Sequence, residues 1–126
     1  TLERSNAVGL LAIRDGQGEA QVSAEDLLIA SLRLRPDRII LGEIRGGEAF
    51  TFLRAINTGH PGSLTTIHAN TPQSALDQLA MLALQGNSGM TWDMVERMAR
   101  ATIDLIVQVE RGSDGRRIVE IYESGA

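Results

Sequence analysis

A strand, a helix and a second strand in close succession constrain the fold of this chain more than any other feature. Residues 38–44 form an apolar run interrupted by Gly42 and Glu43, which is typical of a strand buried on both faces of a parallel sheet. Residues 48–57 repeat apolar side chains at helical spacing, and residues 63–69 are β-branched and alternating. Because a crossover unit of about thirty residues joins two parallel strands through a helix, the sequence predicts such a pair here.

The flanking segments add helices and a hairpin. Ser23 and Asp26 have the spacing of a capping box and predict a helix over residues 24–34, ended by Arg35 and Pro36. The other expected elements are a strand within residues 7–13, a turn at 15–18, helices over 72–85 and 91–101, and strands over 104–110 and 117–122 joined by a tight turn at 112–115. A chain of 126 residues makes about one domain, so we expect residues 1–126 to form one α/β unit with parallel strands, crossover helices and a C-terminal β-hairpin.

The composition excludes several chemistries. All twelve basic residues are arginine and there is no cysteine, so a Schiff-base lysine, a thiol nucleophile, a cysteine zinc site and a lysine-bearing phosphate loop are excluded. The net charge is −4 and the arginines are scattered, so we expect no direct nucleic-acid binding. No stretch approaches about 20 apolar residues and no signal peptide is visible, which favours the cytoplasm.

Polar side chains occupy the carboxyl ends of the two predicted parallel strands, where open α/β sheets bind ligands. Glu43 and Arg45 end the first strand, and Thr66 and His68 end the second. Glu43 follows three aliphatic residues, so its carboxylate needs a cation, a metal-bound water or a hydrogen-bond donor. An ion pair with Arg45 or Arg38, without any ligand, is the alternative.

The segment from Thr58 to His68 combines hydroxyl, imidazole and backbone amide donors, the set that would surround a polyanion such as a terminal phosphate. His60 and His68 lie too far apart for the metal pair of a zinc helix, so we expect no structural zinc. A histidine at a strand end can also be purely structural, and Glu3 can be an ordinary surface acid. Both alternatives stay open.

Two blocks of sequence carry a resemblance to a known family: residues 32–49, with Gly-Glu-Ile-Arg-Gly-Gly-Glu-Ala, and residues 58–70, with Thr-Gly-His-Pro-Gly-Ser. They resemble the Walker B segment and the histidine box of the secretion ATPase superfamily. Its members are the hexameric RecA-like motors of type IV secretion and conjugation, type II secretion and type IV pili. Residues 1–3 resemble the end of its aspartate box, and the two blocks resemble the VirB-type and conjugal-transfer branch more than the pilus-retraction branch.

The resemblance implies roles for individual residues. Glu43 would polarise the attacking water or hold the shell of Mg²⁺, Glu3 would belong to an acidic cluster that assists this water, and His68 would contact the γ-phosphate of ATP. His60, Thr66 and Arg45 would lie at the nucleotide with roles that the resemblance leaves open. It also implies a hexamer at the cytoplasmic face of the inner membrane, peripheral to it and in contact with inner-membrane components of the secretion channel.

One departure from the family is severe. The family's Walker A lysine and its amino-terminal domain precede the aspartate box, and residues 1–126 contain neither. We therefore expect the carboxyl-terminal part of a RecA-like ATPase domain, which alone neither binds ATP tightly nor hydrolyses it. The alternatives are a non-enzymatic assembly or regulatory module with the same fold, and an ATPase of type II secretion or type IV pili.

Overall fold

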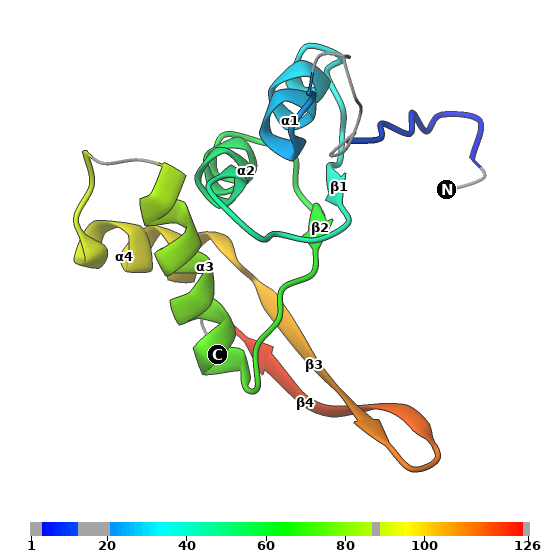
Figure 1. Ribbon diagram of the computed structural model, residues 1–126, viewed down its shortest axis with the longest axis vertical. Coiled ribbons are helices and arrows are strands. Elements are labelled where there is room, and N and C mark those ends of the chain that lie inside the picture. Colours follow the sequence, from blue (N-terminus) through cyan, green and yellow to red (C-terminus); the bar gives the residue numbers. More distant parts are fainter. Residues whose placement is uncertain (1–3, 13–20, 87–88, 125–126) are drawn as a thin grey trace.

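The structure is a computed structural model that describes residues 4–12, 21–86 and 89–124 (Figure 1). Its elements in chain order are α1 (Ala24–Leu32), β1 (Ile40–Leu41), α2 (Glu48–Asn57), β2 (Leu64–Thr65), α3 (Pro72–Gly86), α4 (Trp92–Thr102), β3 (Leu105–Gly112) and β4 (Gly115–Glu123). The predicted α/β class is confirmed, with parallel strands, a crossover helix and a C-terminal hairpin. None of the described helices is long and apolar enough to cross a membrane.

Helix α1 begins with the predicted capping box. The Ser23 side chain accepts a hydrogen bond from the amide of Asp26 (3.1 Å), and the Asp26 carboxylate accepts one from the amide of Ser23 (3.0 Å). The helix ends at Leu32, two residues earlier than predicted. Arg35, directly before Pro36, has a left-handed backbone (φ 51°), so the chain leaves the helix before the proline.

The crossover prediction is confirmed, although the strands are short. β1 and β2 are parallel, with Ile40 opposite Leu64, and α2 connects them. Regular pairing covers two residues of each strand, in place of the predicted 38–44 and 63–69. Single hydrogen bonds extend the contact on both sides, from the amide of Leu64 to the carbonyl of Ile39 and from the amide of Ile44 to the carbonyl of Thr66, both 3.0 Å.

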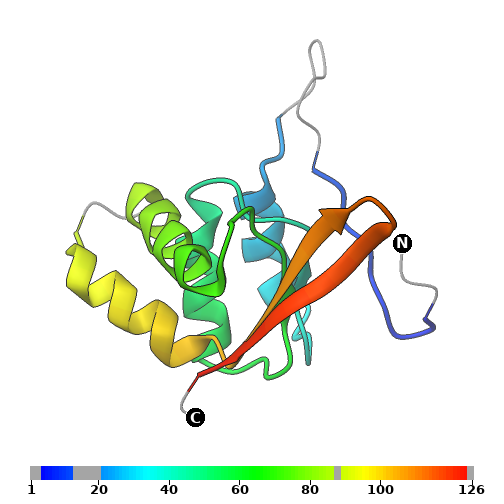
Figure 2. The ribbon, with the colours of Figure 1, turned by 90° about the horizontal axis from the view of Figure 1, so that it is seen from below.

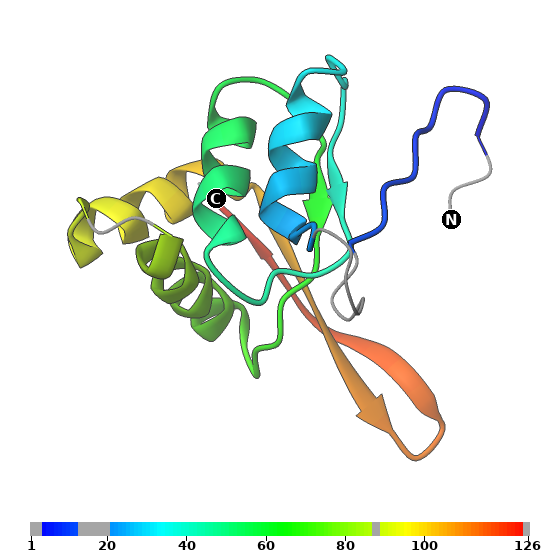
Figure 3. The same cartoon turned by 45° about the horizontal axis from the view of Figure 1, so that its top comes forward.

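The prediction of burial on both faces is wrong for β1. Ile40 is 55% exposed and its partner Leu64 is 61% exposed, whereas Ile39 and Ile44 are buried. Helices α1 and α2 lie together on one side of the strand pair (Figure 3), and nothing in the described ranges covers the other side at Ile40 and Leu64.

The helices lie close together (Figure 2), and most residues of the hydrophobic core come from them. Helix α2 is central: it packs against α1, α3 and α4 and buries Phe52 and Leu53 almost completely. Helix α3 contributes the longest buried face and α4 adds Val95 and Ala99. The predicted bounds of α2 are confirmed, and those of α3 and α4 agree within one residue.

The C-terminal hairpin is confirmed and extends away from the helices (Figure 1). Gly112 and Gly115 are paired, so the turn consists of Ser113 and Asp114. β3 begins one residue later and ends two residues later than predicted, and β4 begins two residues earlier and ends one residue later. A bulge interrupts the register after Gln108.

The strand predicted within residues 7–13 is wrong where the structure describes it. Residues 7–12 form no strand, and Val8 and Leu11 are 72% and 85% exposed. An apolar run becomes a strand only beside a partner, and this segment has none among the described residues. Ile13 and the predicted turn at 15–18 lie outside the described residues.

Candidate functional site

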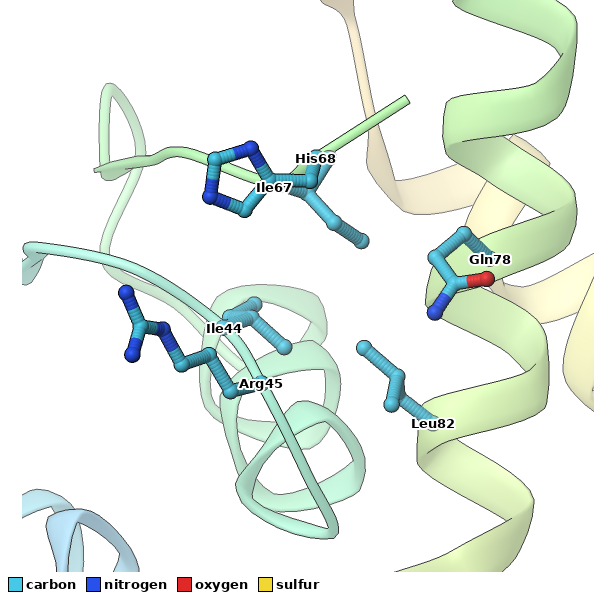
Figure 4. A pocket seen from close by; sticks show the side chains of 6 residues that line it. All are labelled: Ile44, Arg45, Ile67, His68, Gln78 and Leu82. Carbon is cyan, nitrogen blue, oxygen red and sulfur yellow. The ribbon is translucent and has the colours of Figure 1, made fainter. Parts of the chain in front are cut away.

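Three of the residues predicted at the strand ends meet at one carboxylate. Glu43 follows β1 and His68 follows β2, so the parallel strands bring both to the same edge. The carboxylate of Glu43 lies between two nitrogens: Arg45 Nη2 is 2.6 Å from Oε2, and His68 Nε2 is 2.7 Å from Oε1. Figure 4 shows that the Arg45 and His68 side chains come from two separate segments of the chain.

Both oxygens of the Glu43 carboxylate have a nitrogen beside them, Oε2 that of Arg45 and Oε1 that of His68. The contact with Arg45 is the main cause that lowers the pKa of Glu43, and partial desolvation opposes it. The ion pair proposed as the alternative therefore forms, with Arg45. Oε1 is shielded from solvent, and His68 Nε2 lies 2.7 Å from it. The His68 side chain is 89% exposed, so it is free to turn away and leave Oε1 open to a water molecule.

Thr66 ties the two strand ends together. Its hydroxyl donates to the carbonyl oxygen of Gly42 (2.6 Å), and its own carbonyl accepts from the amide of Ile44 (3.0 Å). Gly42 and Ile44 flank Glu43 in the sequence, and Thr66 lies two residues before His68. The hydroxyl of Thr66 therefore fixes the backbone that carries Glu43 against the backbone that carries His68.

Glu48 is a residue of the site that sequence reasoning missed. It is the first residue of α2, and its Oε1 accepts hydrogen bonds from the amides of Arg45 (2.8 Å) and Gly46 (3.1 Å). An acid in the first turn of a helix, directly after two glycines, was the available signal. Its carboxylate holds the loop between Glu43 and α2.

The structure does not bring His60 to this cluster. His60 precedes β2, whereas Glu43 and His68 follow β1 and β2, so His60 lies at the opposite end of the strand pair. Its Nδ1 lies 2.6 Å from the carbonyl oxygen of Pro36, so Nδ1 carries the proton, and Ser63 donates to the carbonyl of His60 (2.7 Å). With a left-handed backbone (φ 63°), His60 forms the corner between α2 and β2. Glu3 lies outside the described residues.

A small pocket adjoins the Glu43 cluster, between the strand ends and α3 (Figure 4). Its volume is about 200 Å³, and its lining residues are Ile44, Arg45, Ile67, His68, Gln78 and Leu82. Gln78 and Leu82 come from α3 and were not predicted. Ligand pockets commonly measure about 300–1,000 Å³, so this pocket alone is small for a nucleotide.

Glu43 is the carboxylate of this cluster that fits a role near a metal ion. No group of three or more His, Cys, Asp or Glu residues in the described ranges is arranged to hold a metal. Mg²⁺ keeps several of its waters and is commonly held by one or two protein carboxylates together with substrate phosphates. A single carboxylate, that of Glu43, therefore fits contact with Mg²⁺ through a water better than an all-protein metal cage.

Comparisons with known proteins agree on one family. A profile of the family described as "Type II/IV secretion system protein" matches residues 2–112. The chain is 42% identical over 119 residues to the type IV secretion system protein VirB11 of Bartonella quintana, which covers 93% of this chain and 33% of that protein. It is 47% identical over 95 residues to the conjugal transfer protein TrbB of Rhizobium radiobacter, covering 75% of this chain and 28% of that protein.

A solved structure agrees with these relatives. The VirB11 ATPase of the Brucella suis type IV secretion system, crystallised in complex with sulphate, superimposes with a TM-score of 0.76 at 36% identity. The superposition covers 81% of this chain and 32% of that chain. The chain therefore spans about a third of the length of the relatives it matches.

Proposed function

The chain belongs to the type II/IV secretion system protein family, and from this premise we propose that it is the carboxyl-terminal part of the motor domain of an ATPase that drives type IV secretion or conjugation. The relatives named VirB11 and TrbB favour the type IV and conjugation branch. The observation that carries the proposal is the ionised Glu43 carboxylate between Arg45 and His68 at the carboxyl ends of two parallel strands.

Glu43 would orient the water that attacks the terminal phosphate. Phosphoryl transfer asks the protein mainly to position the nucleophile and to stabilise the charge that develops. Because Arg45 lowers the pKa of Glu43, its carboxylate is a weak base at neutral pH, which suits orienting the water by accepting a hydrogen bond. Oε1 would accept this bond once His68, which lies 2.7 Å from it, turns toward the phosphate.

His68 and Arg45 would supply donors to the phosphate. Their side chains are 89% and 57% exposed, so both can turn toward a ligand at the strand ends. Each also contacts Glu43, so a bound phosphate would compete with this carboxylate for the imidazole and the guanidinium. Thr66 would support the site by fixing the two strand ends.

Mg²⁺ would be held near Glu43 through a water, together with the phosphates of ATP. When bound, it supplies positive charge that offsets the charge of the phosphates. Glu3 would belong to the acidic group that assists the attacking water, and His60 would act from the far end of β2 by holding the loop that leads into this strand.

The remainder of the nucleotide site would come from a longer protein. Residues 1–126 contain no lysine, so they lack the lysine that a Walker A loop contributes to phosphate binding. The pocket beside Glu43 is small, and Ile40 and Leu64 present an open apolar face that further strands of the domain would cover. This part alone would therefore bind ATP weakly and hydrolyse none.

In the longer protein, we place the domain in a homo-oligomeric ring, a hexamer, at the cytoplasmic face of the inner membrane. The ring would act peripherally on inner-membrane components of the secretion channel. The segment itself would not bind nucleic acid directly, because its net charge is −4.

Calorimetry and a turnover assay test the proposal together. The longer protein that carries this chain should hydrolyse ATP in the presence of Mg²⁺, and the 126-residue chain should show neither hydrolysis nor micromolar ATP binding. Tight binding by the 126-residue chain, or no hydrolysis by the longer protein, would contradict the proposal.

A further inference from the structure

We propose that Glu48 is a positioning residue for Glu43: its carboxylate fixes the backbone of Arg45 and Gly46, and thereby the guanidinium that holds the Glu43 carboxylate. The inference rests on the proposed function of Glu43. It assigns a role to a residue that does not line the pocket and that contacts the cluster of Glu43, Arg45 and His68 only through the backbone amide of Arg45.

The loop from Glu43 to Gly47 is held firmly at its beginning. Ile44 is 2% exposed, and its amide donates to the carbonyl of Thr66. These contacts fix the backbone directly after Glu43. They do not fix Arg45, whose side chain is 57% exposed and whose described polar contact is with Glu43.

Glu48 provides the second anchor. One oxygen, Oε1, accepts hydrogen bonds from two successive amides, those of Arg45 at 2.8 Å and Gly46 at 3.1 Å. Hydrogen bonds to an ionised acceptor are stronger than neutral ones, and the carboxylate lies at the N-terminus of α2, where negative charge is favoured. The N-cap residue, Gly47, has no side chain that could accept hydrogen bonds from these amides.

Gly46 leaves space for this arrangement. A Cβ atom at Gly46 would lie 3.0 Å from Oε2 of Glu48, so a side chain there would press on the carboxylate that folds back over the loop. The two anchors together fix the backbone of residues 44–46. The side chain of Arg45 starts from this fixed backbone, and its Nη2 reaches Glu43 Oε2 at 2.6 Å.

Three variants separate positioning from general support of α2. Glu48→Ala removes the acceptor, and Glu48→Gln keeps an acceptor oxygen at the same reach without the charge. Asp93→Asn is the matched control, because Asp93 is an acid in the first turn of α4 that makes no hydrogen bond within the described part of the chain.

Amide exchange in the 126-residue chain tests the contact. In Glu48→Ala, the amides of Arg45 and Gly46 should exchange about ten- to a hundredfold faster, the factor expected for a charge-assisted hydrogen bond, while those of Phe52 and Leu53 keep their rates. Glu48→Gln should lie between wild type and Glu48→Ala, and Asp93→Asn should match wild type. Unchanged exchange at Arg45 and Gly46, or equal acceleration at Phe52 and Leu53, would overturn the inference.

Turnover in the longer protein tests the consequence. Below the melting temperature, Glu48→Ala should lower kcat about 10- to 100-fold, as misplacement of a catalytic group does, with little change in KM for ATP and with partial recovery in Glu48→Gln. An active wild type with an equally active Glu48→Ala variant would overturn this inference and leave the proposed function intact. An inactive wild type would overturn the proposed function, and this inference with it.

Discussion

Replacing Gly86 by alanine should destabilise the chain, although glycine-to-alanine changes in helices ordinarily stabilise. Gly86 is the last residue of α3, and its backbone lies against that of Gly47, the N-cap of α2. A Cβ atom on Gly86 would overlap the carbonyl oxygen of Gly47 and lie 3.0 Å from its carbonyl carbon. No rotation of a side chain can relieve a clash with the backbone, so one helix end has to move.

The size of the effect follows from two opposing contributions. Alanine in place of glycine inside a helix gains roughly 0.5–1 kcal/mol, and less at a helix end. Overpacking a close contact costs about 1–3 kcal/mol. The carbonyl of Gly47 also accepts the hydrogen bond from the amide of Phe50 (3.1 Å) that opens α2, so its displacement disturbs this turn. We expect a net loss of about 1 kcal/mol, or roughly 4 °C in melting temperature for a chain of this size.

Urea unfolding followed by circular dichroism measures this loss. Gly42→Ala is the matched control, because no atom lies within 4 Å of a Cβ placed at Gly42. Its midpoint should equal or slightly exceed that of the wild type. A Gly86→Ala variant as stable as the wild type, with Gly42→Ala unchanged, would refute the close approach of α3 to the loop that follows Glu43.

Three further predictions concern the site and the core. Arg45→Met should raise the pKa of Glu43 toward its ordinary value of 4.5, as measured by carbon NMR of the carboxyl group. In the wild type the folded-state pKa of Glu43 is below the unfolded-state pKa, so the ion pair stabilises the fold above the unfolded-state pKa. This stabilisation is lost as the pH falls through the folded-state pKa. Thr66→Val should cost about 0.5–1.5 kcal/mol in urea unfolding by removing a hydrogen bond, and Thr66→Ser, which keeps the hydroxyl, should cost less; equal losses would show that the hydroxyl does not contribute. Phe52→Ala should lower the free energy of unfolding by about 3–5 kcal/mol, because Phe52 is 1% exposed. Phe50→Ala, at a half-buried position, should lower it clearly less. The reverse order in thermal unfolding would contradict the assigned core.

The helices and the hairpin were predictable because their signals are local. The capping box at Ser23, the apolar spacing of residues 48–57 and the glycines around residues 113 and 114 each act within a few residues. The lack of a strand in residues 7–12 and the exposure of Ile40 were not predictable, because both depend on neighbours far along the chain. An apolar run records that a residue suits burial and does not record whether a partner is beside it.

The meeting of Glu43 and His68 was predictable from the sequence, whereas the positions of His60 and Glu48 were not. Parallel strand ends bring Glu43 and His68 together, and this follows from the crossover topology. The separation of His60 depends on a contact with Pro36 across 24 positions of sequence, which no local pattern contains. The contact of Glu48 with Arg45 and Gly46 is local, but it depends on the path of the loop after Glu43, and the sequence does not specify this path.

Turnover by the longer protein with Glu43→Gln tests the central claim most directly. The amide keeps the size of the side chain and removes its charge, so the variant should lose about 100-fold or more in kcat while ATP binding in calorimetry changes little. Glu110→Gln, on the exposed hairpin, is the matched control and should keep full activity. Undiminished turnover in Glu43→Gln would contradict the assignment of Glu43 as the carboxylate that orients the attacking water.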